Sequence, residues 1–159
     1  MSAPAAAQRG LGVVITRVFG APRELVWEAW TNPKRLAEWW GPRGFTNPVC
    51  EVTLRVGGAL RIHMRAPNGV IYPMRGVFQE IVKPEKLVFT NIAVDNEDRP
   101  VLDGLTTVTF ADLGGKTELT VKTWAVAVVD YAAAYLAGME AGWTMSIDKL
   151  AQLLAEAGK

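Results

Sequence analysis

The chain has 159 residues, of which 50% are hydrophobic and 21% charged. This is the size and composition of one folded domain, and it excludes wholesale disorder. Seventeen basic and sixteen acidic residues leave a net charge of +1, which lacks the basic excess of a nucleic-acid-binding protein. A single cysteine, Cys50, and a single histidine, His63, exclude an intrachain disulfide and a Cys/His zinc site.

Residues 1–10 are rich in alanine but lack the apolar segment of a signal peptide. We predict that they form a disordered tail before a single domain over residues 11–159. No apolar run approaches the roughly 20 residues that a membrane span requires. Together with the lone cysteine, these features predict a cytoplasmic protein with no membrane partner.

The first part of the chain predicts one strand followed by two short helices. Val13–Phe19 is a β-branched run that is typical of a strand. Pro22 indicates the first turn of a helix, since apolar residues recur after it at helical spacing. Asn32 and Pro33 predict the cap and first turn of a second helix, which ends before Gly41.

After this point the hydrophobic period changes to two, which indicates β-strands. The expected strands are Phe45–Thr53, Ala59–Arg65, Ile71–Ile81, Lys86–Ala93, Leu105–Ala111 and Thr117–Trp124. The short turns between them, such as Asn68-Gly69, predict an antiparallel meander, which has seven strands when the first is included. The longer acidic stretch Asp95–Asp103 is expected to be a mobile lid at one end of the sheet.

The last segment, Asp130–Ala157, contains no proline and predicts one amphipathic helix of roughly 28 residues. Its apolar face must be buried, and only the sheet is large enough to cover it. The predicted fold is α+β: a seven-stranded curved antiparallel sheet gripping a long C-terminal helix, with two short helices after the first strand. A curved sheet cannot contact a straight helix along its whole length, so a ligand-sized gap is expected between them.

Four sequence stretches, in the same order, are similar to one protein family. They are residues 23–31 with the Trp-Trp-Gly-Pro run at 39–42, the Gly-Gly pair at 57–58, residues 76–81 with 84–87, and residues 142–143 with 148–150. The chain resembles the START-like (SRPBCC, helix-grip) superfamily from about Val13 to Leu154, and in particular the branch homologous to the activator of the Hsp90 ATPase. The resemblance implies a ligand cavity but no particular ligand.

We predict that this cavity holds a hydrophobic or aromatic small molecule. The predicted ligand-binding residues are large and mostly apolar: Trp39, Ile62, Met64, Met74, Phe78, Trp124, Tyr135, Met139 and Trp143. Methionine adapts to irregular shapes. Consecutive helical residues point about 100° apart, so one of Trp39 and Trp40 should face the core and the other the mouth. Gly138 and Gly142 are expected to allow close packing of the preceding strand or loop against the C-terminal helix, with cavity space as the alternative.

The sequence contains no catalytic, cofactor or metal motif. Strand alternation places His63 on the outer face, and Cys50 is expected to be a small buried hydrophobe. The primary hypothesis is a binding protein without a cofactor. A polyketide cyclase or aromatase-like enzyme that uses the same cavity is an alternative, and a regulator of a chaperone ATPase is a weaker one. The sequence leaves open whether the chain forms a homodimer.

Overall fold

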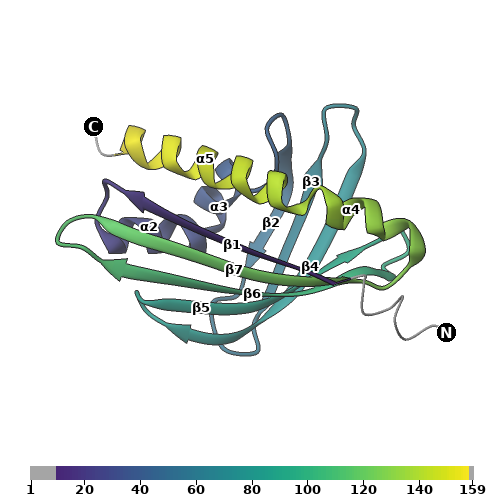
Figure 1. Ribbon diagram of the computed structural model, residues 1–159, viewed down its shortest axis with the longest axis horizontal. Coiled ribbons are helices and arrows are strands. Elements are labelled where there is room, and N and C mark those ends of the chain that lie inside the picture. Colours follow the sequence, from purple (N-terminus) through teal and green to yellow (C-terminus); the bar gives the residue numbers. More distant parts are fainter. Residues whose placement is uncertain (1–9, 158–159) are drawn as a thin grey trace.

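One antiparallel sheet and one long helix dominate the computed structural model, which describes residues 10–157 (Figure 1). The strands are β1 (Gly10–Phe19), β2 (Thr46–Val52), β3 (Ala59–Arg65), β4 (Ile71–Val82), β5 (Lys86–Val94), β6 (Pro100–Asp112) and β7 (Thr117–Ala127). Their order across the sheet is β1-β7-β6-β5-β4-β3-β2. The chain therefore starts at one edge, passes to the other through two helices, and returns strand by strand. The predicted α+β fold and seven-stranded sheet are confirmed.

The helical elements are α2 (Arg23–Thr31), α3 (Pro33–Trp39), η1 (Asp130–Ala132), α4 (Ala133–Ala137) and α5 (Met139–Ala157). Figure 1 shows α5 along the concave side of the sheet, with α2 and α3 at one end and α4 at the other. In the described part of the chain, no helix combines the length and the hydropathy needed to cross a membrane. The predicted tail lies outside the described residues except for Gly10, which pairs with Val126 in the β1–β7 ladder.

The two short helices close one end of the sheet through aromatic packing. The Asn32 side chain accepts a hydrogen bond from the Lys34 amide at 3.0 Å and so caps α3, as its position before Pro33 predicts. Trp39 is fully buried, and its indole N–H donates to the Ala29 carbonyl at 2.9 Å. Trp30 packs edge-on against Trp39, with ring centroids 4.6 Å apart. These contacts join α2 to α3 and anchor both in the core.

The predicted uninterrupted C-terminal helix is wrong in one respect: it is broken at Gly138. The η1 and α4 turns end there, and α5 begins at Met139. A glycine inside a helix costs about 1 kcal/mol relative to alanine, so Gly138 is one of two weak positions in the segment, with Gly142. The break allows Ala132 and Leu136 to pack on the strand residues Val101, Ala125 and Ala127, in a small cluster separate from the main core.

The predicted lid is also shorter than the sequence suggested. Residues 100–103 belong to β6, because the strand pairing extends to Pro100 opposite Val94. The remaining turn is braced by the Asp95 carboxylate. It accepts hydrogen bonds from the amides of Glu97 at 2.8 Å and Arg99 at 2.9 Å, and from the Arg99 guanidinium at 2.9 Å.

The pairing of β4 with β5 is irregular beside a close backbone approach. Their register shifts between Phe78 and Glu80, and the Val77 amide donates to the Thr90 hydroxyl at 2.8 Å. A Cβ atom on Gly76 would collide with the Thr90 carbonyl oxygen. Only glycine allows this approach of the two backbones, and bulges of this kind increase sheet curvature.

Gly76→Ala is therefore expected to lower the free energy of unfolding by about 3 kcal/mol, because either the methyl group or the β5 backbone must move. Gly20→Ala is the matched control, since a Cβ there meets no atom within 4 Å. Urea denaturation of both variants measures the difference. Equal stability of the two variants would show that the β4–β5 approach is not constrained.

Candidate functional site

A cavity of about 580 Å³ lies between the concave face of the sheet and the α4–α5 segment. This volume is within the range of small-molecule sites, roughly 300–1,000 Å³. Its walls come from the loop after α3, from strands β3 to β7, and from η1, α4 and α5. The gap that the sequence predicted between sheet and helix is thus present, at the α4 end.

On the sheet side of this cavity, the central strands β5 to β7 contribute small residues. Beneath α2 and the C-terminal half of α5 the inward positions carry large side chains, such as Phe89 and Phe110, that fill the main core. Toward α4 the same strands present small side chains. Ala93 and Ala125 line the cavity, and Gly104 lies opposite Ala125 in the β6–β7 ladder. These short side chains leave space between this part of the sheet and α5, beside the contacts that Ala125 makes with Ala132 and Leu136.

The helix side of the cavity is also thinned, at Gly138 and Gly142. A Cβ atom at Gly138 would meet only the Tyr135 carbonyl oxygen, at 3.9 Å, and one at Gly142 only Pro42, at 3.8 Å. The predicted close packing at these glycines is therefore wrong. Both glycines border open space, and both line the cavity.

Aromatic rings form much of the remaining wall. Trp143 packs edge-on against Trp40, with centroids 5.3 Å apart. Tyr135 makes T-shaped contacts with Tyr72 at 6.3 Å and with Tyr131 at 6.2 Å. All five of these rings line the cavity. Ring faces and edges of this kind favour contact with flat, apolar or aromatic molecules.

A chain of polar side chains reaches the cavity from the middle of the sheet. The Thr106 hydroxyl donates to the Asn91 side-chain oxygen at 2.7 Å and lies 2.8 Å from the Thr123 hydroxyl. Because the Thr106 hydroxyl donates its proton to Asn91, the Thr106 oxygen accepts a hydrogen bond from the Thr123 hydroxyl. Both threonines are buried, whereas Asn91 is half-buried and lines the cavity.

Two side chains of α5 hold the loop that forms the cavity rim. The Ser146 hydroxyl accepts from the Gly41 amide and donates to the Gly142 carbonyl, both at 3.0 Å. The Lys149 ammonium donates to the carbonyls of Gly41 at 3.1 Å and Pro42 at 3.4 Å. Burial lowers the pKa of Lys149. The rim loop is therefore attached to the helix through its backbone.

The structure brings five of the nine predicted ligand-binding residues together around the cavity: Met64, Met74, Tyr135, Met139 and Trp143. Three others, Trp39, Ile62 and Phe78, are fully buried in the main core and do not line the cavity. Of the two consecutive tryptophans, Trp40 faces the cavity and Trp39 the core. One tryptophan of the pair faces the core and the other does not, as expected. The predicted ligand-binding set, however, contains Trp39 and lacks Trp40, which lines the cavity.

Trp124 lies on the opposite face of the sheet. It is 52% exposed, and its indole covers Gly10 and Gly12 of the neighbouring β1. Odd-numbered residues of β7, such as Thr123 and Ala125, are the buried ones. Strict alternation therefore turns Trp124 outward, where it covers glycine backbone instead of a ligand.

Sequence reasoning missed the small residues and Asn91. Ala93, Gly104 and Ala125 carry no chemistry, so nothing in their type indicates a site. A signal was nevertheless available, because inward-facing positions of adjacent strands all became small over the same stretch. Asn91 could have been found as a polar residue at an inward position of a strand that is otherwise apolar.

The cavity contains few ionisable groups. Of its lining residues only Asp95, Tyr72, Tyr131 and Tyr135 titrate, and burial raises the pKa of Tyr135. Hydrogen bonds from the Arg99 and Glu97 amides lower the pKa of Asp95. Within residues 10–157 there is no group of three His, Cys, Asp or Glu side chains that could hold a metal ion.

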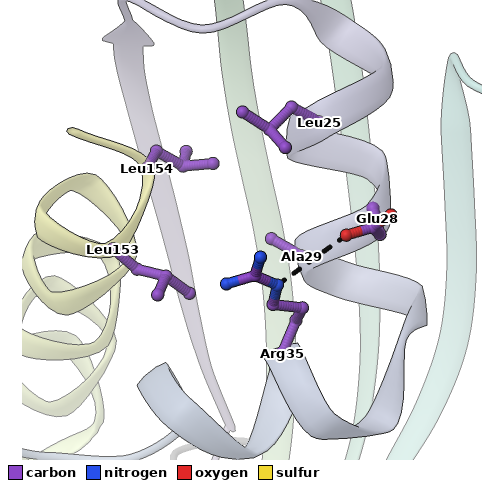
Figure 2. Close-up of a pocket in the computed structure, with 6 residues that line it drawn as sticks. All are labelled: Leu25, Glu28, Ala29, Arg35, Leu153 and Leu154. Atoms are coloured by element: carbon purple, nitrogen blue, oxygen red, sulfur yellow. Dashed lines mark ion pairs between the residues drawn. The ribbon is translucent and has the colours of Figure 1, made fainter. Parts of the chain in front are cut away.

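A second, much smaller pocket lies between α2, α3 and the end of α5 (Figure 2). Its volume is about 10 Å³, enough for one water molecule. Leu25 and Leu154 line it, and an ion pair of 3.7 Å joins Arg35 to Glu28 at its edge. This pocket is a packing defect of the core and too small for a ligand.

Cys50 and His63 do not form a catalytic pair. Cys50 lies opposite Ile62 in the β2–β3 ladder, so the next residue, His63, points to the other face. Neither residue lines the cavity. Burial, and secondarily the Glu51 charge, raise the pKa of Cys50 to about 11, which keeps the thiol protonated and unreactive at neutral pH.

Alkylation of Cys50 by iodoacetamide near neutral pH is therefore expected to be about a hundredfold slower in the folded protein than in the urea-unfolded chain. The rate should rise with pH and reach half of its maximum near pH 11, where half of the thiol is ionised. Mass spectrometry of timed samples measures it. A rate equal to that of the unfolded chain would contradict the proposed protonation state.

Comparison with known proteins agrees with this geometry. The family model "Activator of Hsp90 ATPase homolog 1-like protein" matches residues 20–155. The crystal structure of protein CV1439 from Chromobacterium violaceum is similar, with 31% identity, a TM-score of 0.75, and coverage of 90% of this chain and 96% of its own. A solution structure from Arthrobacter aurescens has 26% identity and a TM-score of 0.78, and covers 92% of this chain and 87% of its own.

Protein NE0264 from Nitrosomonas europaea is 25% identical over 93% of this chain and 96% of its own, with a TM-score of 0.75. No curated protein matches the chain. The family match covers most of the sequence and the seven-stranded helix-grip architecture agrees with it. The chain belongs to the family of Activator of Hsp90 ATPase homolog 1-like proteins.

Proposed function

We propose that the protein binds a hydrophobic or aromatic small molecule in the cavity between the sheet and α5. The observation that carries this proposal is the space itself: about 580 Å³ bounded by small residues on both walls. Protein interiors are normally packed to the density of organic crystals. A cavity of this size forgoes contacts that larger side chains could make, and a bound ligand restores them.

The chemistry of the walls favours an apolar ligand. Three methionine or tryptophan side chains from opposite walls, Met74, Met139 and Trp143, reach the same space. Each Å² of apolar surface that a ligand buries contributes about 25 cal/mol before the costs of association. Methionines adjust to the outline of the ligand, and the aromatic rings favour flat ones.

Binding is favoured over catalysis by the poor supply of reactive groups. The only carboxylate among the lining residues, Asp95, is already paired with Arg99 at 2.9 Å. The raised pKa of Tyr135 keeps its phenol protonated at neutral pH. An acid–base mechanism needs a group poised to exchange protons near the working pH. A role toward a chaperone ATPase, as in the name of the family, is not supported by any feature of this cavity.

Gly142→Leu tests the proposal, because the new side chain projects into the cavity from α5. The neutral fluorescent dye N-phenylnaphthylamine is expected to bind the wild-type protein with a stoichiometry of one. In Gly142→Leu its affinity should fall by at least about tenfold through lost volume and contacts. Fluorescence titration measures both quantities.

Gly142→Ala is the matched control. The methyl group would make ordinary contact with Pro42 at 3.8 Å and take little space. It should raise helix stability by up to about 1 kcal/mol and leave dye affinity within about twofold of wild type. Unchanged binding in Gly142→Leu, or no saturable binding in the wild type, would overturn the proposed function.

A further inference from the structure

Asn91 lies at the centre of the cavity floor. It faces inward on β5 and pairs with Gly104 on β6. A Cβ atom on Gly104 would lie 2.8 Å from the Asn91 side-chain nitrogen. The glycine thus makes room for the amide, and its own lack of a side chain widens the cavity. The amide is held against the sheet by the local packing.

The orientation of this amide is set by its oxygen. The Asn91 oxygen accepts from Thr106 at 2.7 Å, and Thr106 is braced in turn by Thr123 at 2.8 Å. Both threonines are buried in the sheet. The amide NH₂ group therefore faces away from them, toward the cavity that Asn91 lines.

The NH₂ group makes no hydrogen bond to any residue from 10 to 157, whereas the side-chain oxygen accepts the bond from Thr106. An amide donor in a largely apolar site gains most from an acceptor that enters with a ligand. A site that presents a hydrogen-bond donor to a ligand also discriminates against ligands that cannot pair with it.

Charge narrows the ligand class further. Among residues 10–157, no lysine, arginine or histidine lines the cavity, so an anionic ligand would lose its hydration without compensation. Asp95 is the one acidic lining residue, and Arg99 already neutralises it. The site therefore offers no free counter-charge to a cation.

We propose that the cavity selects uncharged aromatic ligands that carry a carbonyl-type oxygen, which accepts a hydrogen bond from the Asn91 NH₂ group. Thr106 and Thr123 act as positioning residues that keep this donor pointed at the ligand. The proposal rests on the proposed function and adds to it the chemical class of the ligand. The flat walls around Trp143 and Tyr135 accommodate the ring system.

Fluorenone and fluorene are the probes, because they share one tricyclic skeleton and differ by a carbonyl in place of a methylene group. Calorimetry of wild-type protein is expected to show about a tenfold preference for fluorenone. Asn91→Leu should abolish the preference while fluorene affinity stays within about twofold. Asn91→Asp keeps the bond from Thr106 but has no NH₂ group, so it should abolish the preference as well.

Thr106→Val and Thr107→Val form a matched pair on one strand. Thr106 faces inward and is buried, whereas Thr107 lies on the other face. Loss of the Thr106 hydroxyl frees the amide to rotate and should reduce the preference by roughly half on a logarithmic scale. Thr107→Val should retain it in full. A general loss of strand stability would not produce this difference in fluorenone preference between the two variants. Thermal unfolding of both variants measures their stability.

The outcomes separate the two proposals. Equal affinity for the two probes in wild-type protein, or a preference that survives in Asn91→Leu and Asn91→Asp, overturns the role of Asn91 and leaves the ligand cavity in place. If neither these probes nor N-phenylnaphthylamine binds, the proposed function fails and this inference fails with it.

Discussion

The site depends on a change in side-chain size along the concave face of one sheet. At one end Phe89 and Phe110 fill the space up to α2 and α5. At the other end Ala93, Gly104 and Ala125 leave it open. Both ends belong to the same strands and share the same hydrogen-bonded ladder. The smaller side chains at the second end therefore help to leave the space that forms the cavity.

This division assigns stability and binding to separate regions. Trp30 and Trp39 join the short helices to the core, and Ile147 and Leu150 of α5 are fully buried there. Packing of this kind supplies most of the free energy of folding. The cavity end can therefore remain underpacked, as binding sites generally must, while the helix stays attached. Ser146 connects the two regions, since it binds both the rim loop and the helix backbone.

The polar network in the floor follows from the same arrangement. A strand that is buried on its inner face can carry a polar side chain only if that group finds partners. Asn91 finds one partner in Thr106, and its NH₂ group has none among residues 10–157. In a fully packed sheet this would be a defect. Next to a cavity, the Asn91 NH₂ group is available to donate a hydrogen bond to a ligand.

Local patterns were sufficient to predict most of the fold. Period-two alternation identified the strands after Phe45, and Asn32-Pro33 located the start of α3. These signals are local because the direction of a side chain depends on neighbouring backbone angles alone. The break at Gly138 was missed, since two glycines in the segment weaken the helix similarly. The helix breaks at Gly138 and not at Gly142 because Leu136, just before Gly138, packs on β7.

The sequence by itself determined the order of the elements, the antiparallel meander, the buried face of α5, and the presence of a gap between helix and sheet. Only the tertiary structure decided which residues border that gap. Met64, Met139 and Trp143 reach it, whereas the equally apolar Ile62 and Phe78 do not. The physical reason is that a cavity is defined by the volume left between side chains on elements far apart in the chain. The residue pattern of one strand does not indicate the distance from that strand to the opposite wall of the cavity.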